Sequence, residues 1–161
     1  MALFVVVGTF DPPTLGHVAL VEAARAMGER VVVFVANNAA KHPLFDARSR
    51  CELMRASLSH LDGVDVEIVT GLVAARARDL GAHALVKGVR DATDVSYEIA
   101  QADINRDIAH IETILLPAPP HLRAVSSSLV KELARLGADV SPYVPDPVAR
   151  ALADCCQGEQ S

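Results

Sequence analysis

The sequence predicts an α/β protein with a Rossmann-like, doubly wound sheet of five parallel strands, in a single domain over residues 1–156. Three observations support this fold class. Short apolar runs alternate with amphipathic segments along the chain. The 161 residues suffice for one ordinary domain and contain no internal repeat or low-complexity linker. Hydrophobic residues make up 51% of the chain and aromatic residues only 4%, so we expect an aliphatic core.

The first half of the chain alternates strand and helix. Continuous β-branched runs are typical of strands buried on both faces of a parallel sheet, and apolar stripes at helical spacing indicate helices. Gly28 is placed to end the first predicted helix, and Asp46 can cap the second. The predicted elements are, in order, a strand at 3–7, a helix at 17–27, a strand at 31–36, a helix at 46–58 and a strand at 64–69.

The second half continues the alternation. Gly81 and Gly137 follow predicted helices, and the pair Asp146-Pro147 suits the cap and the first position of a last helix. The predicted elements are, in order, a helix at 72–80, a strand at 84–86, a helix at 96–108, a strand at 111–116, a helix at 127–136, a helix from 147 to about 154, and a frayed tail at 157–161.

Charge, cysteine usage and hydropathy argue against several classes of function. A net charge of -5 gives no overall positive field for a nucleic acid or an anionic membrane. Cys51 and the adjacent Cys155 and Cys156 lack the spacing of a zinc site and fit a reducing compartment. The apolar run before Gly8 is too short for a signal peptide, and no later window approaches the ~20 apolar residues of a spanning helix. We therefore expect a cytoplasmic protein without nucleic-acid or membrane partners.

The residues that can carry chemistry follow the predicted strands. Ligands of open α/β sheets bind outside the carboxyl ends of the strands, where helix N-termini expose backbone N–H groups. The first loop reads GTFDPPTLGH and offers Gly8 for close backbone approach, Thr9 as a donor, and His17 in the first helical turn. It matches neither GxGxxG nor GxxxxGK[ST]. The loop predicts a phosphate site of another type, with an imidazole attached.

Four segments carry a resemblance to a known family. Thr14-Leu15-Gly16-His17 resembles the T/HxGH signature of a nucleotidyltransferase superfamily with a Rossmann-like fold. Within it, the bacterial phosphopantetheine adenylyltransferases have three similar segments, an [RK]GxR loop, a YE pair and an SSSxVK segment. In this chain these are Lys87-Gly88-Val89-Arg90, Tyr97-Glu98 and residues 126–131. Lys41, followed by Pro43 and Phe45, falls where that family carries a substrate-binding lysine.

The resemblance implies transfer of the adenylyl group of ATP to 4'-phosphopantetheine, by in-line attack at the α-phosphorus, giving dephospho-coenzyme A and pyrophosphate. It implies that the catalytic residues are His17 and Lys41, and that the acceptor is bound by Thr9, Lys41, Val73 and Lys87. The implied ATP contacts are Thr9, Phe10, His17, Gly88, Val89, Arg90, Glu98, Leu122, Arg123, Ala124, Val125, Ser126, Ser127 and Ser128. Mg²⁺ would bridge the substrate phosphates without a protein cage. The resemblance also suggests a homohexamer, with coenzyme A as a candidate feedback ligand.

Each segment also has an ordinary structural interpretation. Lys87 and Arg90 could be solvated loop cations, and the serines at 126–128 could cap the helix that follows. Their joint order after successive strands outweighs these interpretations. Three other functions stay open: a related nucleotidyltransferase acting on nicotinamide mononucleotide or glycerol phosphate, a non-catalytic nucleotide-binding module, and a flavodoxin-like flavin carrier.

Overall fold

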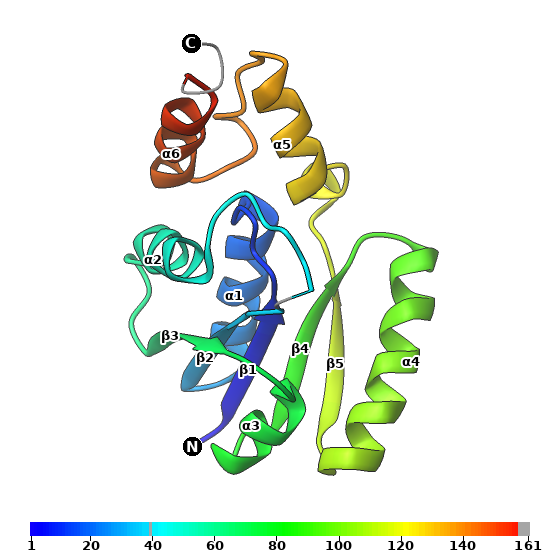
Figure 1. Cartoon of the computed structure of the whole chain (residues 1–161). Helices are drawn as coiled ribbons and strands as arrows, with labels where there is room; N and C mark the ends of the chain where they lie inside the picture. Colours follow the sequence, from blue (N-terminus) through cyan, green and yellow to red (C-terminus); the bar gives the residue numbers. More distant parts are fainter. Residues whose placement is uncertain (39, 158–161) are drawn as a thin grey trace.

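The structure, a computed structural model, describes residues 1–38 and 40–157 and has a sheet of five parallel strands at its centre (Figure 1). The strands pair in the order β3-β2-β1-β4-β5, and every neighbouring pair is parallel. Their bounds are β1 Leu3–Gly8, β2 Arg30–Ala36, β3 Val64–Val69, β4 Ala84–Val89 and β5 Glu112–Pro117. The predicted α/β fold class is confirmed.

Helices cover both faces of the sheet, as a doubly wound fold requires. α1 and α2 pack on one face through a core cluster that includes Val21 and Met54. α3 and α4 pack on the other face through a cluster that includes Ala77 and Ala109. The described helices are α1 (Leu15–Met27), α2 (Ala47–Ser57), α3 (Val73–Asp79), α4 (Ala92–Ala109), α5 (Ser127–Arg135) and α6 (Asp146–Gln157), with a short 3₁₀ helix at Pro120–Leu122.

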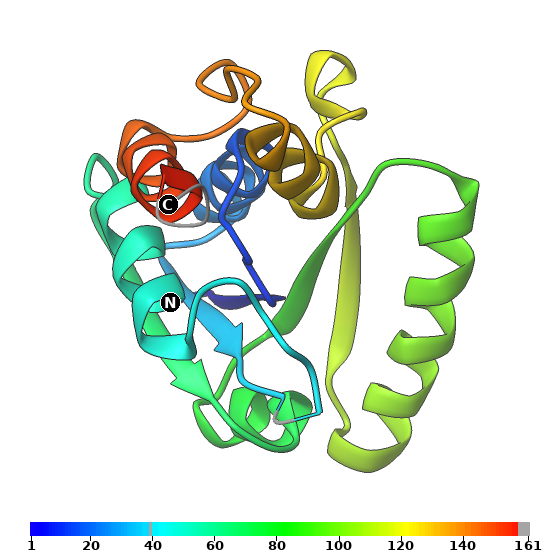
Figure 2. The same cartoon turned by 45° about the horizontal axis from the view of Figure 1, so that its top comes forward.

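The last two helices lie beyond the ends to which the strands run (Figures 1 and 2). Val130 of α5 and Val148 of α6 belong to a third apolar cluster, against which Leu15 of α1 and Leu53 of α2 pack. The backbone N–H of Leu15 also donates to the carbonyl of Tyr143 at 2.9 Å. The start of α5 is thereby held near the start of α1, at the edge of the sheet where ligands of this fold class bind.

The element boundaries differ from the prediction by three or more residues at three places. β4 continues to Val89 because its last residues pair with β5 as far as Pro117. α4 begins at Ala92, four residues earlier than predicted, because the Asp91 side chain accepts the backbone N–H of Asp94 and caps the helix. α6 begins at Asp146 itself and continues through Gln157, beyond the predicted end near Asp154. The rest of the predicted tail, residues 158–161, lies outside the described residues.

None of the helices within the described residues is long and apolar enough to cross a membrane. The two apolar clusters on the faces of the sheet account for the continuous apolar runs of the strands. β1 shows this division, because Val6 faces the cluster of α1 and α2 whereas Val5 faces that of α3 and α4. A strand that is buried on both faces does not alternate polar and apolar residues, as the sequence predicted.

Candidate active site

A cavity of about 440 Å³ lies at the carboxyl ends of β1 and β4. These two strands are the point where the strand order reverses, since β2 and β3 extend to one side and β5 to the other. The lining comes from the loop after β1, the first turns of α1, the end of β4, the start of α4, the loop after β5 and the start of α5. A crevice at such a reversal is where open α/β sheets bind ligands.

The loop after β1 is shaped by Gly8 and Phe10. Phe10 adopts a left-handed backbone conformation with φ of 53°, which turns its ring back over Gly8. A Cβ on Gly8 would lie 2.7 Å from the Phe10 ring, so only glycine allows this packing. The edge of the ring meets the imidazole of His17, with the ring centroids 4.9 Å apart and an interplanar angle of 87°. The Asp11–Pro12 peptide that follows is cis.

Thr14 and His17 form a reciprocal cap at the start of α1. The backbone N–H of His17 donates to Thr14 Oγ1, and the backbone N–H of Thr14 donates to His17 Nδ1 at 3.0 Å. A nitrogen that accepts a backbone N–H carries no proton, so the neutral ring has its proton on Nε2. The cap therefore leaves His17 with an Nε2–H donor for a ligand in the cavity that it lines.

His17 is held neutral in the folded protein. Burial lowers its pKa from 6.5 to about 4, and the charges of Arg90 and Lys87 contribute in the same direction. Protonation at Nδ1 would in addition break the hydrogen bond from Thr14. Near neutral pH, His17 is therefore a hydrogen-bond donor without a charge.

Stability should fall as the pH drops from about 6.5 to about 4. Unfolded His17 binds a proton near the upper value, whereas folded His17 binds one only near the lower value, so the unfolded state takes up more protons in this window. A His17→Gln variant cannot titrate there. Between about pH 7 and about pH 5, urea unfolding should show the wild type losing about 1–2 kcal/mol more stability than the variant. Equal losses would contradict a depressed pKa.

One lysine and one arginine side chain line the cavity, each beside a carboxylate. Lys87 Nζ lies 3.4 Å from Glu98 Oε1, and Arg90 Nε lies 3.1 Å from Asp94 Oδ2. Burial alone would raise the pKa of Asp94, but the hydrogen bonds from Arg90 outweigh it and lower the pKa. The Asp94 carboxylate thus stays charged. Each of the two carboxylates fixes the direction of its cation, which suits the binding of a phosphate chain.

The N-terminus of α5 supplies a third group of donors. Ser126 caps the helix by accepting the backbone N–H of Leu129 at 3.1 Å, which confirms the expected capping role of this serine segment. Ser127 Oγ donates to the carbonyl of Pro12 at 2.8 Å and so ties the helix to the loop after β1. Both serines and Ser128 line the cavity, where the positive end of the helix dipole favours an anion.

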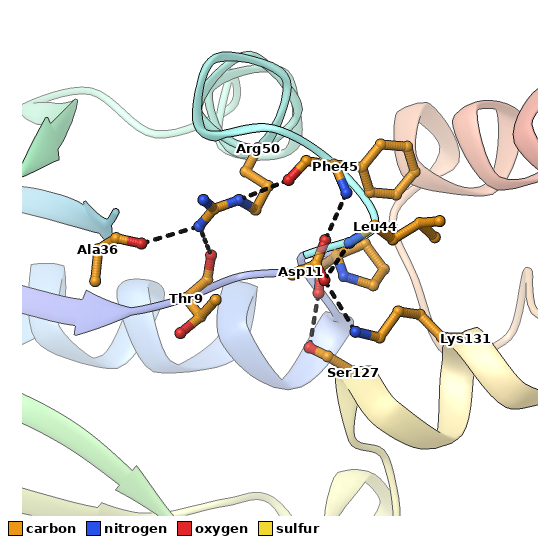
Figure 3. A network of polar contacts seen from close by, with 9 residues as sticks. Thr9, Asp11, Ala36, Leu44, Phe45, Arg50, Ser127 and Lys131 are labelled. Atoms are coloured by element: carbon orange, nitrogen blue, oxygen red, sulfur yellow. Dashed lines mark hydrogen bonds and ion pairs between the residues drawn. The ribbon is translucent and has the colours of Figure 1, made fainter. Parts of the chain in front are cut away.

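Asp11 links three of the segments that meet at this end of the sheet (Figure 3). Its carboxylate accepts the backbone N–H groups of Leu44 and Phe45, each at 2.9 Å, and pairs with Lys131 Nζ at 2.9 Å. The side chain of Asp11 is only 5% exposed and that of Lys131 is 22% exposed. This network joins the loop after β1, the loop after β2 and helix α5 into one support beneath the cavity.

Comparison with known proteins decides the family. The sequence model of the cytidylyltransferase-like family matches residues 5–133. A phosphopantetheine adenylyltransferase of Psychromonas ingrahamii is 41% identical over 146 residues, which are 90% of this chain and 91% of that protein. Another, from Beijerinckia indica subsp. indica, is 40% identical over 152 residues, with 91% of each chain covered. The chain belongs to the phosphopantetheine adenylyltransferase family.

A solved structure of another protein has a similar fold. A Vibrio parahaemolyticus protein, described as a candidate nicotinate-nucleotide adenylyltransferase, has a TM-score of 0.65 and 19% identity, with 95% of this chain and 99% of that chain covered. At this identity the likeness shows the shared fold alone. Membership of the phosphopantetheine adenylyltransferase family rests on the sequence relatives, and it makes the chain a nucleotidyltransferase, as the motifs predicted.

Most of the residues that the phosphopantetheine adenylyltransferase motifs predict for the site meet in the cavity. Those that line it are Phe10, His17, Lys87, Gly88, Arg90, Glu98, Leu122, Val125, Ser126, Ser127 and Ser128. They come from separate motifs that lie far apart in the sequence. The joint order of the motifs after successive strands therefore has a structural basis.

The other predicted residues lie outside the cavity lining. Thr9 stands between two lining residues, and its backbone carbonyl accepts a hydrogen bond from Arg50 Nη1. Lys41 is exposed in the loop after β2, and Val73 is half-buried at the first position of α3. Val89 is buried. The side chains of the remaining two, Arg123 and Ala124, are exposed beside the cavity. The binding roles implied by the phosphopantetheine adenylyltransferase resemblance stay predictions for these residues.

Four residues that shape this family site are not among the predicted site residues. Asp94 lines the cavity and follows its partner Arg90 by four residues, a spacing that could have indicated the pair. Asp11 and Lys131 both lie within the motifs but are 120 residues apart, and nothing local indicates that they pair. Arg50 lies outside every motif.

Proposed function

We propose that this chain transfers the adenylyl group of ATP to 4'-phosphopantetheine and releases dephospho-coenzyme A and pyrophosphate. The observation that carries the proposal is the neutral Nε2–H donor of His17, placed in one cavity with two cations and the starts of three helices, α1, α4 and α5. The family name of the relatives identifies the reaction class and the acceptor.

The reaction forms one bond and breaks one. An oxygen of the acceptor phosphate attacks the α-phosphorus of ATP, and the bond from that phosphorus to the bridging oxygen of the β-phosphate breaks in line. Pyrophosphate leaves with the electron pair. Because both reacting groups are phosphates, the protein contributes by placing them in line and by stabilising the charge that develops on their oxygens.

On the ATP side, His17 donates Nε2–H to an α-phosphate oxygen, and Arg90 and the start of α5 hold the phosphates that leave. A neutral donor binds an oxygen more strongly as that oxygen gains charge in the transition state. Asp94 keeps the guanidinium of Arg90 fixed while the phosphate chain is bound. Mg²⁺, bound mainly through substrate oxygens, would neutralise part of the charge of the triphosphate.

The residues around the cavity fit this role for Mg²⁺. Within the described residues no group of three or more His, Cys, Asp or Glu side chains could form a metal cage. The two carboxylates that line the cavity, Asp94 and Glu98, already face Arg90 and Lys87. A cation bound mainly through substrate oxygens needs few protein ligands.

On the acceptor side, Thr9, Lys41 and Lys87 orient the phosphate of 4'-phosphopantetheine. All three lie at the carboxyl ends of neighbouring strands, β1, β2 and β4. The pantetheine arm runs over the apolar surface at the start of α3, where Val73 is half-buried and Leu72 is 66% exposed. Coenzyme A contains the same arm, which makes it a candidate competitor for this surface.

An assay of pyrophosphate release tests the proposed function. ATP and CTP are each supplied with Mg²⁺ and with 4'-phosphopantetheine, nicotinamide mononucleotide or glycerol phosphate as acceptor. Turnover should require ATP and 4'-phosphopantetheine together. Preference for another acceptor would assign the chain to a related nucleotidyltransferase, and binding of ATP without turnover would mark it as a non-catalytic module.

The proposal includes a cytoplasmic homohexamer, and the surface of α4 supports self-association. Tyr97, Ile104 and Ile108 lie along one stripe of this helix and are 64%, 54% and 47% exposed. The helix lies at the outer edge of the molecule beside β5 (Figures 1 and 2). Exposed apolar stripes of this kind mark sites of protein association.

Light scattering should give the assembly six times the chain mass of 17.1 kDa. Ile104→Glu places a charge in the stripe on α4, and it should lower the mass towards that of a smaller species. Arg48→Glu, on the exposed surface of α2, should leave the mass unchanged. A wild-type mass equal to one chain would contradict the hexamer.

A further inference from the structure

Arg50 is a buried cation whose hydrogen bonds all go to the backbone. Its side chain lies on α2 and is among the most buried of the described residues, with 1% of the residue exposed. Nε donates to the carbonyl of Phe45 at 3.0 Å, and Nη1 donates to the carbonyls of Thr9 at 2.7 Å and Ala36 at 3.0 Å (Figure 3). Burial of a charge is costly unless it is well paired, so these contacts call for an explanation.

The three carbonyls belong to the two loops that carry Thr9 and Lys41, the groups proposed to bind the acceptor phosphate. Ala36 ends β2 and Phe45 precedes the cap of α2, so they stand at the two ends of the loop that carries Lys41. Thr9 directly follows β1. One guanidinium therefore fixes both ends of the Lys41 loop and the backbone of Thr9 in a single arrangement.

A lysine could not replace this guanidinium. The planar fork of arginine directs its N–H bonds along several fixed directions, whereas an ammonium is a point charge with three rotatable donors. The three carbonyls belong to separate segments of the chain. An ammonium at this position can satisfy some of them only if the segments move relative to one another.

We propose that Arg50 is a positioning residue, which sets the place of Thr9 relative to the Lys41 loop and so aligns the acceptor phosphate for attack. This inference rests on the proposed function, because it assigns both groups to the acceptor. The groups on the ATP side are held separately. His17 is fixed by Thr14, and Arg90 by Asp94.

The test compares Arg50→Lys with Arg55→Lys. Arg55 lies on the same helix and also donates to a backbone carbonyl, that of Val66 at 2.7 Å, away from the cavity. Calorimetry counts the ATP-binding sites in each variant, and turnover is expressed per site. For R50K we expect kcat/KM for 4'-phosphopantetheine to fall about 10- to 100-fold, with the dissociation constant of ATP within about threefold of wild type. R55K should keep both values.

Each result separates the positioning role from the alternatives. An R50K variant with unchanged kcat/KM per ATP site would overturn the proposal, and so would an equal loss in R55K. If R50K binds no ATP, Arg50→Gln is measured in the same way, and loss of ATP binding there as well would overturn the proposal because Arg50 would then support the whole site. Failure of the wild type to use 4'-phosphopantetheine would instead reject the proposed function.

Discussion

Replacement of His17 by alanine should lower kcat by about 10²- to 10³-fold and change the dissociation constant of ATP by less than about tenfold. Loss of one donor that acts on the oxygens of a transition state typically has an effect of this size. The hydrogen bond from His17 strengthens as charge moves onto the α-phosphate oxygens, so its loss affects turnover more than ATP binding.

The control for this variant is His60→Ala. His60 is exposed and pairs with Glu22 on the surface, away from the cavity, so the variant should keep the wild-type rate. His17→Asn tests the donor itself, because an amide can still donate a hydrogen bond, and it should retain more activity than the alanine variant. Near-wild-type turnover of His17→Ala would refute the assignment.

The depressed pKa of His17 fits a donor better than it fits an acid. An imidazolium with a pKa of about 4 is deprotonated at neutral pH. The neutral ring keeps its proton on Nε2 and can donate a hydrogen bond, but it has no second, acidic proton to transfer. The reaction needs no proton transfer to pyrophosphate for atoms to balance. Burial and the neighbouring Arg90 and Lys87 thus hold the ring in one protonation state across the physiological range.

The fold could be predicted from sequence because its signals are local. Runs such as residues 3–7 and 31–36 are apolar on both faces, and the helices between them end at glycines or begin at capping residues. The start of α4 at Ala92, four residues before the predicted one, also has a local signal in Asp91. The hydrophobic pattern does not mark this start, because the amphipathic pattern of α4 is weak and leaves much of its apolar surface exposed.

The candidate site could be predicted only in part. His17, Arg90 and the serines stand in recognisable strings, and the cavity brings them together. The supports behind them could not be found in this way. The three bonds of Arg50 go to backbone carbonyls, which every residue type carries, so no pattern of side chains indicates them. The partner of Asp11 depends on how α5 packs over the sheet.

Asp11→Asn should lower the free energy of unfolding by about 3 kcal/mol. The variant leaves Lys131 without its partner carboxylate in a half-buried position. An amide also presents only one oxygen, whereas the carboxylate accepts the N–H groups of Leu44 and Phe45 on separate oxygens. At least one buried donor must then lose its partner.

Asp65→Asn is the matched control for this substitution. Asp65 also pairs with a cation, Arg30, but both side chains are more than half exposed, so the change should cost less than about 1 kcal/mol. Urea unfolding of the two variants at neutral pH measures both values. Equal costs would show that burial of the Asp11 network adds nothing to stability.

The pH dependence of the Asp11 variant separates the charge from the shape of the side chain. Burial alone would raise the pKa of Asp11, but the N–H of Phe45, Lys131 and the N–H of Leu44 together hold the pKa below 3.8. Because the folded pKa is lowered, the stabilisation is present above the unfolded value and is lost as the pH falls through the folded one. The difference in stability between wild type and Asp11→Asn should therefore shrink below about pH 4. A difference that stays constant on acidification would mean that packing, and not the charge of Asp11, joins the loops and α5 beneath the cavity.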